Sequence, residues 1–289
     1  MADSENTHAP GLLRVVLVVL VTVLTACGAQ PSSAVSMAVG AGPSPDSELL
    51  ANLYAAALRS YGTPAHVEVT PDPLAGLDSG SITVVPGFTG TLLRLFAPDT
   101  AGRTGETVYR EMVGVLPEGL AAGDYTTAAE DKPAAAVTES TATAWGDSDL
   151  AALVSHCDEV SAGAVRGSVP PRRVGACRVP EAREFPNNAA LFDALRAGLI
   201  NVAWTSTADP EVPAEVVLLA DRKPVLIAAE NAVPLYRRNE LSARQVLAVN
   251  EVAGVLSTEA LKQMRAQVAD GADPRQVAEA WLTDNPLGR

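Results

Sequence analysis

The side chains that most often carry out catalysis or hold metal ions are few in this chain of 289 residues. The spacing of Cys157, Cys177, His66 and His156 matches no metal-binding pattern. The sequence also lacks a Gly-x-Ser-x-Gly elbow, a Walker-type phosphate loop, a Gly-x-Gly-x-x-Gly loop and a His-Glu-x-x-His pair. Acidic residues are numerous, but no spacing singles out an acid–base pair. We therefore expect no catalytic residues, no metal site and no cofactor.

The third cysteine, Cys27, closes a hydrophobic N-terminal segment. An apolar run over residues 15–24 follows Arg14 and is about half the roughly 20 residues that a membrane-spanning helix needs. A short apolar core behind a positive charge is typical of a signal peptide. The ending Leu-Thr-Ala-Cys resembles the lipobox of bacterial lipoproteins, which implies a signal peptide over 1–26 and a lipidated Cys with a flexible tether over 27–36. An ordinary secretory signal or an uncleaved anchor are the alternatives.

The other two cysteines, Cys157 and Cys177, remain as a pair if Cys27 carries lipid. Outside the cytoplasm, such a pair tends to oxidise. We therefore predict a disulfide, and two buried free thiols are the competing interpretation.

Charge and length limit the class of protein further. The chain carries 34 acidic and 21 basic residues, a formal net charge of −13, which argues against nucleic-acid binding because that needs a basic face. For the same reason, attachment to a membrane would rely on lipid and not on attraction to anionic headgroups. About 250 residues remain after the signal segment, enough for one large domain or two lobes.

Strand-like and helix-like stretches alternate along this remainder, which indicates an α/β fold. The expected strands are 37–39, 66–69, 82–85, 134–138, 201–204, 215–219 and 225–229. The expected helices are one capped by Asp46 and ended by Gly62, then 107–116, 189–195, one capped by Ser257, and one that Asp273 and Pro274 begin. Residues 160–186 show little periodicity and are expected to be irregular.

Several segments together resemble the substrate-binding proteins of quaternary-amine ABC importers, the osmoprotectant-uptake family. Residues 39–54 resemble the opening of that family, and residues 79–93 resemble its Pro-x-aromatic-Thr-Gly-Thr segment. Residues 231–235, Asn-Ala-Val-Pro-Leu, resemble its Asn-Val-Ala-Pro-Leu segment, and 256–287 resemble its last two helices. Residues 201–209 resemble the strand before its Ser-Thr-Asp turn.

The resemblance implies a two-lobed α/β fold of the type II periplasmic-binding-protein kind, with a small solute held between the lobes. Two crossing strands would join the lobes, near 134–138 and 228–234. The first lobe would contain 37–137 and 232–289, and the second 138–231. The resemblance also implies delivery of the solute to an ABC permease at the outer face of the cell membrane.

The ligand-binding residues that we expect combine the resemblance with local features. Asp46 and Ser47 begin a helix whose free N–H groups can receive acceptor atoms, and Asn231 offers both a donor and an acceptor. The full set is Phe88, Thr89, Asp46, Ser47, Trp204, Thr205 and Asn231.

The chain departs from the family in its aromatic residues. Members of the family surround a trimethylammonium group with rings, whereas here at most Phe88, Trp204 and Trp145 could reach the cleft. We therefore expect weaker binding of quaternary ammonium ligands and a shift toward polar, hydrogen-bonded solutes. The alternative function is an envelope lipoprotein with a binding-protein fold that no longer transports and acts through protein–protein contacts.

Lipidation is directly testable. We predict that the exported protein begins at Cys27 and carries a thioether-linked diacylglycerol, whose two acyl chains suffice for stable anchoring where one chain is marginal. Cys27→Ala should release the protein or leave the signal peptide uncut. Intact-mass measurement of native protein provides the test, and residues 1–26 still attached to it would refute the prediction.

Overall fold

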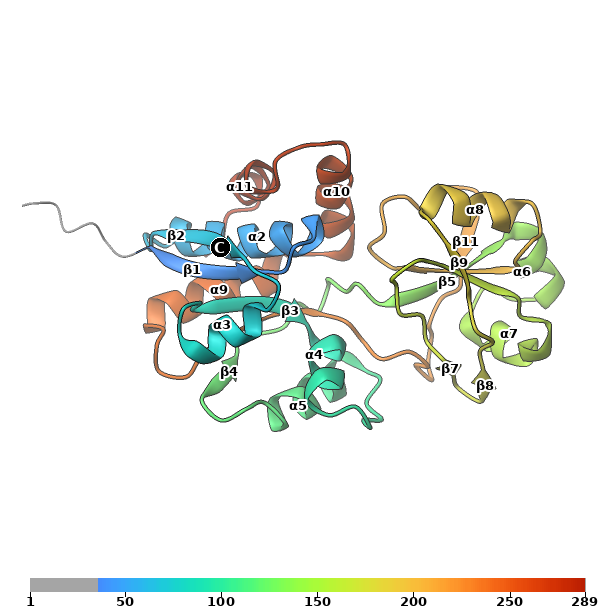
Figure 1. Ribbon diagram of the computed structural model, residues 1–289, viewed down its shortest axis with the longest axis horizontal. Helices are drawn as coiled ribbons and strands as arrows, with labels where there is room; N and C mark the ends of the chain where they lie inside the picture. The colour runs from blue at the N-terminus through green and yellow to red at the C-terminus, as the bar shows by residue number, and fades with distance from the viewer. Residues whose placement is uncertain (1–35, 289) are drawn as a thin grey trace, which may run out of the picture. The chain divides into compact units, whose positions relative to one another are not determined.

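The computed structural model describes residues 36–288, and Cys27, the signal segment 1–26 and nearly all of the tether lie outside these residues. Residues 36–288 form two five-stranded sheets and a short two-stranded hairpin, with helices packed on the sheets (Figure 1). Within the described residues, no helix is both long enough and apolar enough to cross a membrane. The α/β class predicted from the sequence is confirmed.

The first sheet has the strand order β2-β1-β3-β12-β4. Its strands are β1 (Met37–Ala41), β2 (Ala65–Val69), β3 (Val84–Phe88), β4 (Leu120–Ala122) and β12 (Ala232–Arg237). β1 pairs in parallel with β2 and β3, whereas β12 pairs antiparallel with β3 and β4. Its helices are α2 (Pro45–Ser60), α3 (Pro73–Ser79), α4 (Thr89–Phe96), α5 (Gly105–Gly114), α9 (Ala243–Val255), α10 (Thr258–Ala269) and α11 (Pro274–Asp284).

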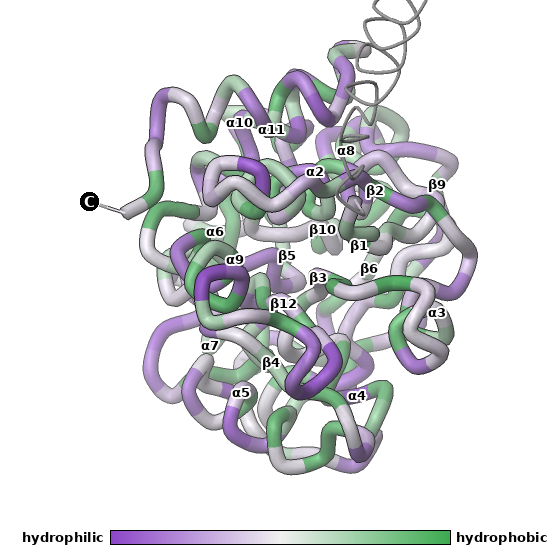
Figure 2. Tube along the Cα trace, turned by 90° about the vertical axis from the view of Figure 1, so that its left-hand side faces the viewer, coloured by the Kyte–Doolittle hydropathy of each residue, from purple (hydrophilic) through white to green (hydrophobic). Residues whose placement is uncertain are grey.

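Two hydrophobic cores cover the first sheet. One core contains Leu53 of α2 and Val252 of α9 together with residues of α10 and α11. The other contains Leu93 of α4 and Met112 of α5 together with a residue of α3. Figure 2 shows hydrophobic residues along the central strands β1 and β3, while hydrophilic residues are frequent on the outer helical turns and loops. Burial of these apolar side chains therefore holds the helices onto the sheet.

The second sheet has the strand order β11-β5-β10-β6-β9. Its strands are β5 (Pro133–Thr138), β6 (Ala162–Val165), β9 (Arg183–Phe185), β10 (Val202–Ser206) and β11 (Val216–Leu218). β10 pairs in parallel with β6 and antiparallel with β5. Its helices are α6 (Glu139–Trp145), α7 (Leu150–Ser155), the 3₁₀ helix η1 (Cys157–Glu159) and α8 (Asn188–Arg196), and the hairpin is β7 (Arg173–Val174) with β8 (Cys177–Arg178).

The chain passes between the two sheets twice. It leaves the first sheet after β4 and enters the second at β5, then leaves after β11 and returns at β12. The expected crossing near 134–138 is therefore misplaced, because those residues already belong to β5, and the crossing segment is 123–132. The second crossing segment is 219–231, and Glu130 and Asn231 form an antiparallel bridge between the two segments.

Helix starts follow the capping residues closely, with one correction. The predicted caps Ser257 and Asp273 are confirmed, since each side chain accepts a hydrogen bond from the first turn of its helix. The cap of α2 is Ser44, which accepts from Ser47 N, and not the predicted Asp46. Pro45 occupies the first helical position, where its missing N–H costs nothing, and this places Asp46 inside the first turn.

Two stretches of the chain differ from the sequence-based expectation. Residues 225–229 form no strand, because the Asp221 carboxylate accepts the N–H groups of Leu226 and Ile227. Residues 160–186, expected to be irregular, contain β6, β7, β8 and β9. β6 is short and made of small residues, and a Cβ on Gly163 would lie 2.6 Å from Ile200 Cδ1. Such a strand carries no alternating pattern that periodicity could detect.

The predicted disulfide between Cys157 and Cys177 is present and joins η1 to β8. Cys177 is buried in the core of the second sheet, which also contains Trp145 and Trp204. The disulfide therefore fastens the hairpin to the 3₁₀ helix that follows α7.

Removing this disulfide should destabilise the protein measurably. The two cysteines are 20 residues apart, and closing a loop of that size stabilises by about 3 kcal/mol in the chain-entropy model. The double variant Cys157→Ala/Cys177→Ala should lose a free energy of unfolding of this order in urea titrations under oxidising conditions. Reduction of the wild type should produce the same loss, and a variant as stable as the oxidised wild type would contradict the prediction.

Candidate functional site

A cleft with a volume of about 640 Å³ is lined by residues from elements of both sheets. One part of the lining comes from the start of α2, from α10, from the first crossing segment and from the start of β5. It consists of Ser44, Pro45 and Asp46, then Arg265, Val268 and Ala269, then Asp131 and Pro133. The remaining lining, from the second sheet and its loops, consists of Val165, Ser168, Val169, Pro170, Asn188, Trp204, Thr205, Ser206, Asp209, Pro210 and Glu211. The volume lies in the range of small-molecule sites, about 300–1,000 Å³.

Arg265 on α10 is the central charged residue of the cleft. Its side chain is only 6 % exposed, and its Nη2 donates to Asp131 Oδ2 at 2.7 Å. Its Nε lies 3.4 Å from Asp46 Oδ1, and its Nη1 donates to the Ala208 carbonyl oxygen at 3.4 Å. The guanidinium carbon lies 6.0 Å from the centroid of the Phe88 ring. Arg265 thus connects α10 to the start of α2, to a crossing segment and to the loop that follows β10.

The two carboxylates beside Arg265 respond to it differently. Burial raises the pKa of Asp131, but the hydrogen bond and charge of Arg265 lower it more, so the pKa lies below its ordinary value. Partial removal from water raises the pKa of Asp46, as does repulsion from Asp131 and Asp209, and the charge of Arg265 does not offset these effects. Asp131 is therefore the ionised partner of Arg265, whereas the more distant contact with Arg265 does not bring the pKa of Asp46 down to its ordinary value.

The opposite wall is organised around Asp209. Its carboxylate accepts hydrogen bonds from the Thr205 hydroxyl, from Asn188 Nδ2 at 3.1 Å and from Glu211 N at 2.8 Å. Trp204, which precedes Thr205 on β10, is only 3 % exposed and also belongs to the core of the second sheet. These bonds fix the loop after β10 at the cleft.

One apolar residue of the lining is unusually open to solvent. Val169 is 88 % exposed and lies in the loop between β6 and β7. Val268 and Ala269 of α10 provide apolar surface elsewhere in the lining of the same cleft. The lining therefore combines apolar surface with several carboxylates.

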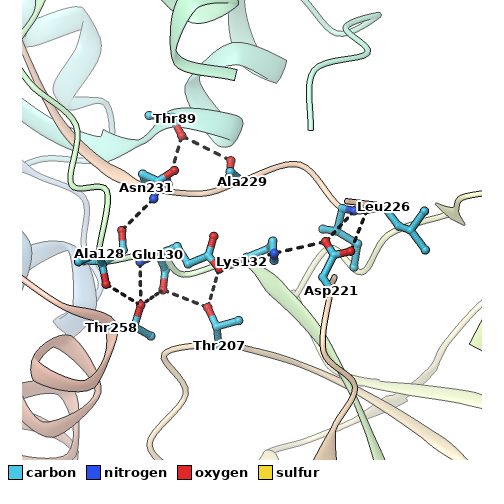
Figure 3. Close-up of polar contacts among 12 residues, drawn as sticks. Thr89, Ala128, Glu130, Lys132, Thr207, Asp221, Leu226, Ala229, Asn231 and Thr258 are labelled. Carbon is cyan, nitrogen blue, oxygen red and sulfur yellow. Dashed lines mark hydrogen bonds and ion pairs between the residues drawn. The ribbon is translucent and has the colours of Figure 1, made fainter. Parts of the chain in front are cut away.

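Hydrogen bonds hold the two crossing segments together (Figure 3). Asn231 Nδ2 donates to the carbonyl oxygens of Thr126 at 2.9 Å and Ala129 at 3.3 Å. Its backbone N donates to Thr89 Oγ1 at 3.1 Å, and Thr89 N donates to its carbonyl oxygen at 2.9 Å. A Cβ on Gly90 would lie 2.6 Å from the Ala229 carbonyl oxygen, so the close approach here requires glycine.

A second group of contacts connects the first crossing segment to α10, to the loop after β10 and to the second crossing segment (Figure 3). Glu130 N donates to Thr258 Oγ1 at the start of α10, and Thr207 Oγ1 donates to the Glu130 carbonyl oxygen, both at 3.0 Å. The ammonium of Lys132, whose side chain is 10 % exposed, lies 3.2 Å from Asp221 Oδ2 in the second crossing segment. The crossing segments therefore form a hydrogen-bonded unit and not two independent linkers.

The sequence-predicted site residues fall into two groups. Asp46, Trp204 and Thr205 line the cleft. Phe88, Ser47, Thr89 and Asn231 are not among its lining residues. Ser47 Oγ accepts from Gly42 N at 2.7 Å, and Thr89 and Asn231 are bonded to each other. Trp145, one of the three rings that could have reached the cleft, is instead buried in the core of the second sheet with its ring 5.4 Å from that of His156.

Sequence reasoning missed Arg265, Asp131 and Asp209. Arg265 follows Met264 on the buried side of α10, where a charged residue is unusual, and this was the available signal. Asp131 and Asp209 lie in loops, and no spacing relates them to Arg265. Among the described residues, no group of three or more His, Cys, Asp or Glu is arranged to hold a metal ion.

Two α/β units joined by two crossing segments, with a cleft lined from both, define the two-lobed type II periplasmic-binding-protein fold. Known structures share it. The chain resembles apo YehZ from Escherichia coli at 18 % identity, covering 88 % of this chain and 99 % of that one, with a TM-score of 0.67. It resembles a glycine betaine/carnitine/choline ABC transporter structure at 15 % identity, with coverages of 86 % and 98 % and a TM-score of 0.70.

A choline-binding protein of an ABC transporter, in complex with choline, is similar at 18 % identity, with coverages of 89 % and 91 % and a TM-score of 0.58. At these identities, the three likenesses establish the fold. No curated protein sequence matches this chain. Residues 36–284, however, match the family model described as the substrate binding domain of ABC-type glycine betaine transport systems.

The chain therefore belongs to this family of substrate-binding domains, and it is a solute-binding protein of an ABC importer. The family is extracytoplasmic, and its members bind small solutes and deliver them to ABC permeases. They are binding proteins and not enzymes.

The ion pair between Asp131 and Arg265 should contribute strongly to stability. Asp131→Asn leaves a buried guanidinium with only the exposed Asp46 beside it, and we expect a loss of about 3 kcal/mol in free energy of unfolding. The control Asp46→Asn, at a side chain that is 58 % exposed, should cost at most about 1 kcal/mol. Chemical denaturation of the two variants near pH 7 makes the comparison.

The effect of Asp131→Asn should depend on pH in a defined direction. Because the folded-state pKa of Asp131 lies below its ordinary value of 3.8, its contribution is complete above that value and is lost as pH falls through the folded-state pKa. The stability difference between wild type and Asp131→Asn should therefore shrink below about pH 4. A difference that stays constant down to pH 2 would show that the ionised pair is not its source.

Proposed function

We propose that the cleft binds a small osmolyte-like solute, of the glycine betaine and choline class or a more polar relative, for delivery to an ABC permease. The observation that supports this most is one cleft lined by residues of both sheets and containing Arg265, Asp46 and Asp131. Charged groups at the junction of two units suit a ligand that is held between them.

We assign ligand contact to the three predicted residues that line the cleft, Asp46, Trp204 and Thr205. Phe88 would act indirectly, because its ring lies against the guanidinium of Arg265 and not in the lining. Thr89 and Asn231 would set the geometry of the crossing segments, and Ser47 would hold the turn before α2 through Gly42 N. This division separates residues that contact the solute from residues that position them.

We further propose that the two units act as lobes that close on the solute, with the hinge in the crossing segments. The sequence-based lobes 37–137 with 232–289, and 138–231, then need one adjustment, because β5 from Pro133 belongs to the second lobe. Closure about a few residues between element ends is a common mechanism of binding proteins. Export and anchoring through Cys27 at the outer face of the cell membrane complete the proposal.

The alternative, a non-transporting lipoprotein that acts through protein contacts, is not favoured. The family is one of solute-binding proteins, and the cleft has the volume and charged lining of a solute site. Thermal-shift and calorimetric screening of betaines, choline, carnitine, polyols and amino acids separates the two functions. A ligand present at 100 times its Kd should stabilise the protein by about 2.7 kcal/mol.

The contribution of Trp204 to binding can be isolated with a matched control. Trp204→Leu removes the ring that lines the cleft, and Trp145→Leu removes a ring of the same core that does not. Both variants should lose comparable stability, because both side chains are buried. We expect at least tenfold weaker binding of the best screened ligand only for Trp204→Leu.

Calorimetric titration of both variants at a temperature where both are folded makes this measurement. Phe88→Leu should weaken binding less, because it acts through Arg265. Equal affinity in Trp204→Leu and the wild type would place the site elsewhere.

A further inference from the structure

The charge of the cleft is unbalanced. Its described lining contains four carboxylates, those of Asp46, Asp131, Asp209 and Glu211, and a single guanidinium, that of Arg265. Arg265 is already engaged by Asp131 at 2.7 Å and by Asp46 at 3.4 Å. A ligand carboxylate would therefore be repelled by the excess negative charge of the described lining. The lining also offers it no cationic side chain that is not already paired with a carboxylate. A cation without a carboxylate complements this electrostatic field better.

Aromatic surface is scarce in the same lining. Trp204 is the one aromatic residue among the described lining residues, and it is only 3 % exposed. The ring of Phe88 lies against the protein's own cation, with 6.0 Å between its centroid and the guanidinium carbon of Arg265. Ring faces are what offsets the loss of water around an ammonium that cannot donate hydrogen bonds. The cleft offers little of that compensation.

Hydrogen-bond acceptors are plentiful instead. The Asp46 side chain is 58 % exposed at the start of α2, and Glu211 is exposed on the opposite side of the cleft. Ser206 also lines the cleft. A protonated primary amine donates three hydrogen bonds, and those that carboxylates accept are about twice as strong as neutral ones. A permethylated nitrogen donates none and would leave these acceptors unpaired on closure.

We propose that the solute of this cleft is a small protonated amine, recognised through its N–H groups by Asp46 and neighbouring acceptors, in preference to a quaternary ammonium. The proposal rests on the proposed function, because it specifies the solute class of the same cleft. Asp46 is the side chain that makes the distinction, since it lines the cleft, is 58 % exposed and lies 3.4 Å from Arg265, whereas Asp131 is 18 % exposed and accepts from Arg265 at 2.7 Å.

The experiment uses ligands that differ only in methylation of the nitrogen. Ethanolamine, N-methylethanolamine, N,N-dimethylethanolamine and choline share one hydroxyl and one positive charge near pH 7. Calorimetric titration of the full-length protein in detergent should show affinity falling along this series, with choline at least tenfold weaker than ethanolamine. Equal affinity, or choline as the tightest ligand, would overturn the inference and leave the proposed function intact.

A series without any binding would also overturn the inference. If betaines, carnitine, polyols and amino acids then failed to bind as well, the proposed function would fail separately. The two failures are therefore distinguishable by the ligand panel.

A matched pair of variants tests the role of Asp46. Asp46→Asn removes a carboxylate from the lining, and Glu48→Gln removes one from the same first turn of α2 outside the lining. We expect Asp46→Asn to reduce the ratio of choline Kd to ethanolamine Kd toward one, while Glu48→Gln keeps the wild-type ratio. An equal loss of affinity for both ligands in Asp46→Asn would show that charge alone acts, and would overturn recognition through N–H groups. Thermal unfolding of both variants verifies that they are folded.

Discussion

The buried guanidinium of Arg265 is the interaction on which the arrangement of the cleft depends. A cation that is 6 % exposed is tolerated only when its charge is paired and its N–H groups find acceptors. Here the partners come from three places in the chain: Asp131 in a crossing segment and the carbonyl of Ala208 after β10 accept hydrogen bonds, and Asp46 at the start of α2 pairs with the charge at 3.4 Å. Pairing the charge and the N–H groups of one side chain thus holds together three segments that are far apart in sequence. The same requirement explains why the lining is acidic, since the carboxylates that stabilise Arg265 also face the cleft.

If the two units close on the solute, as proposed above, the crossing segments must be rigid locally and still allow that motion. The Asn231 side-chain amide donates to the carbonyl oxygens of Thr126 and Ala129 and so joins the two segments. Gly90 permits the approach of the Ala229 carbonyl at the start of α4. Because these bonds join the segments to each other, a rotation can be absorbed at their ends without separating them, as hinge motions generally require.

The sequence predicted the fold well where local signals agree with the global structure. Ser257 and Asp273 cap their helices as expected, and the cysteine pair is joined, because these features depend on few residues that are near in sequence or unique by type. The prediction of a strand over residues 225–229 was wrong because the Asp221 carboxylate accepts the N–H groups of Leu226 and Ile227. Strand propensity contains no information about such a contact. The site was only partly predictable for the same reason. Arg265 acquires its role from partners in three other segments, and that information exists only in the folded chain.

The composition of the cleft can be understood as a choice between two ways of holding a cation away from water. Aromatic faces do so without hydrogen bonds and therefore suit permethylated nitrogen, whereas carboxylates and hydroxyls require N–H donors. This chain, with 4 % aromatic residues, demonstrates the second way in its own structure, because Arg265 is a hydrogen-bonding cation held mainly by carboxylates, with Phe88 at 6.0 Å. The acceptors that remain beside it, above all Asp46, are of the same chemical kind. A ligand that imitates the N–H groups of a guanidinium or an ammonium would use them fully, and one whose nitrogen is covered by methyl groups would not.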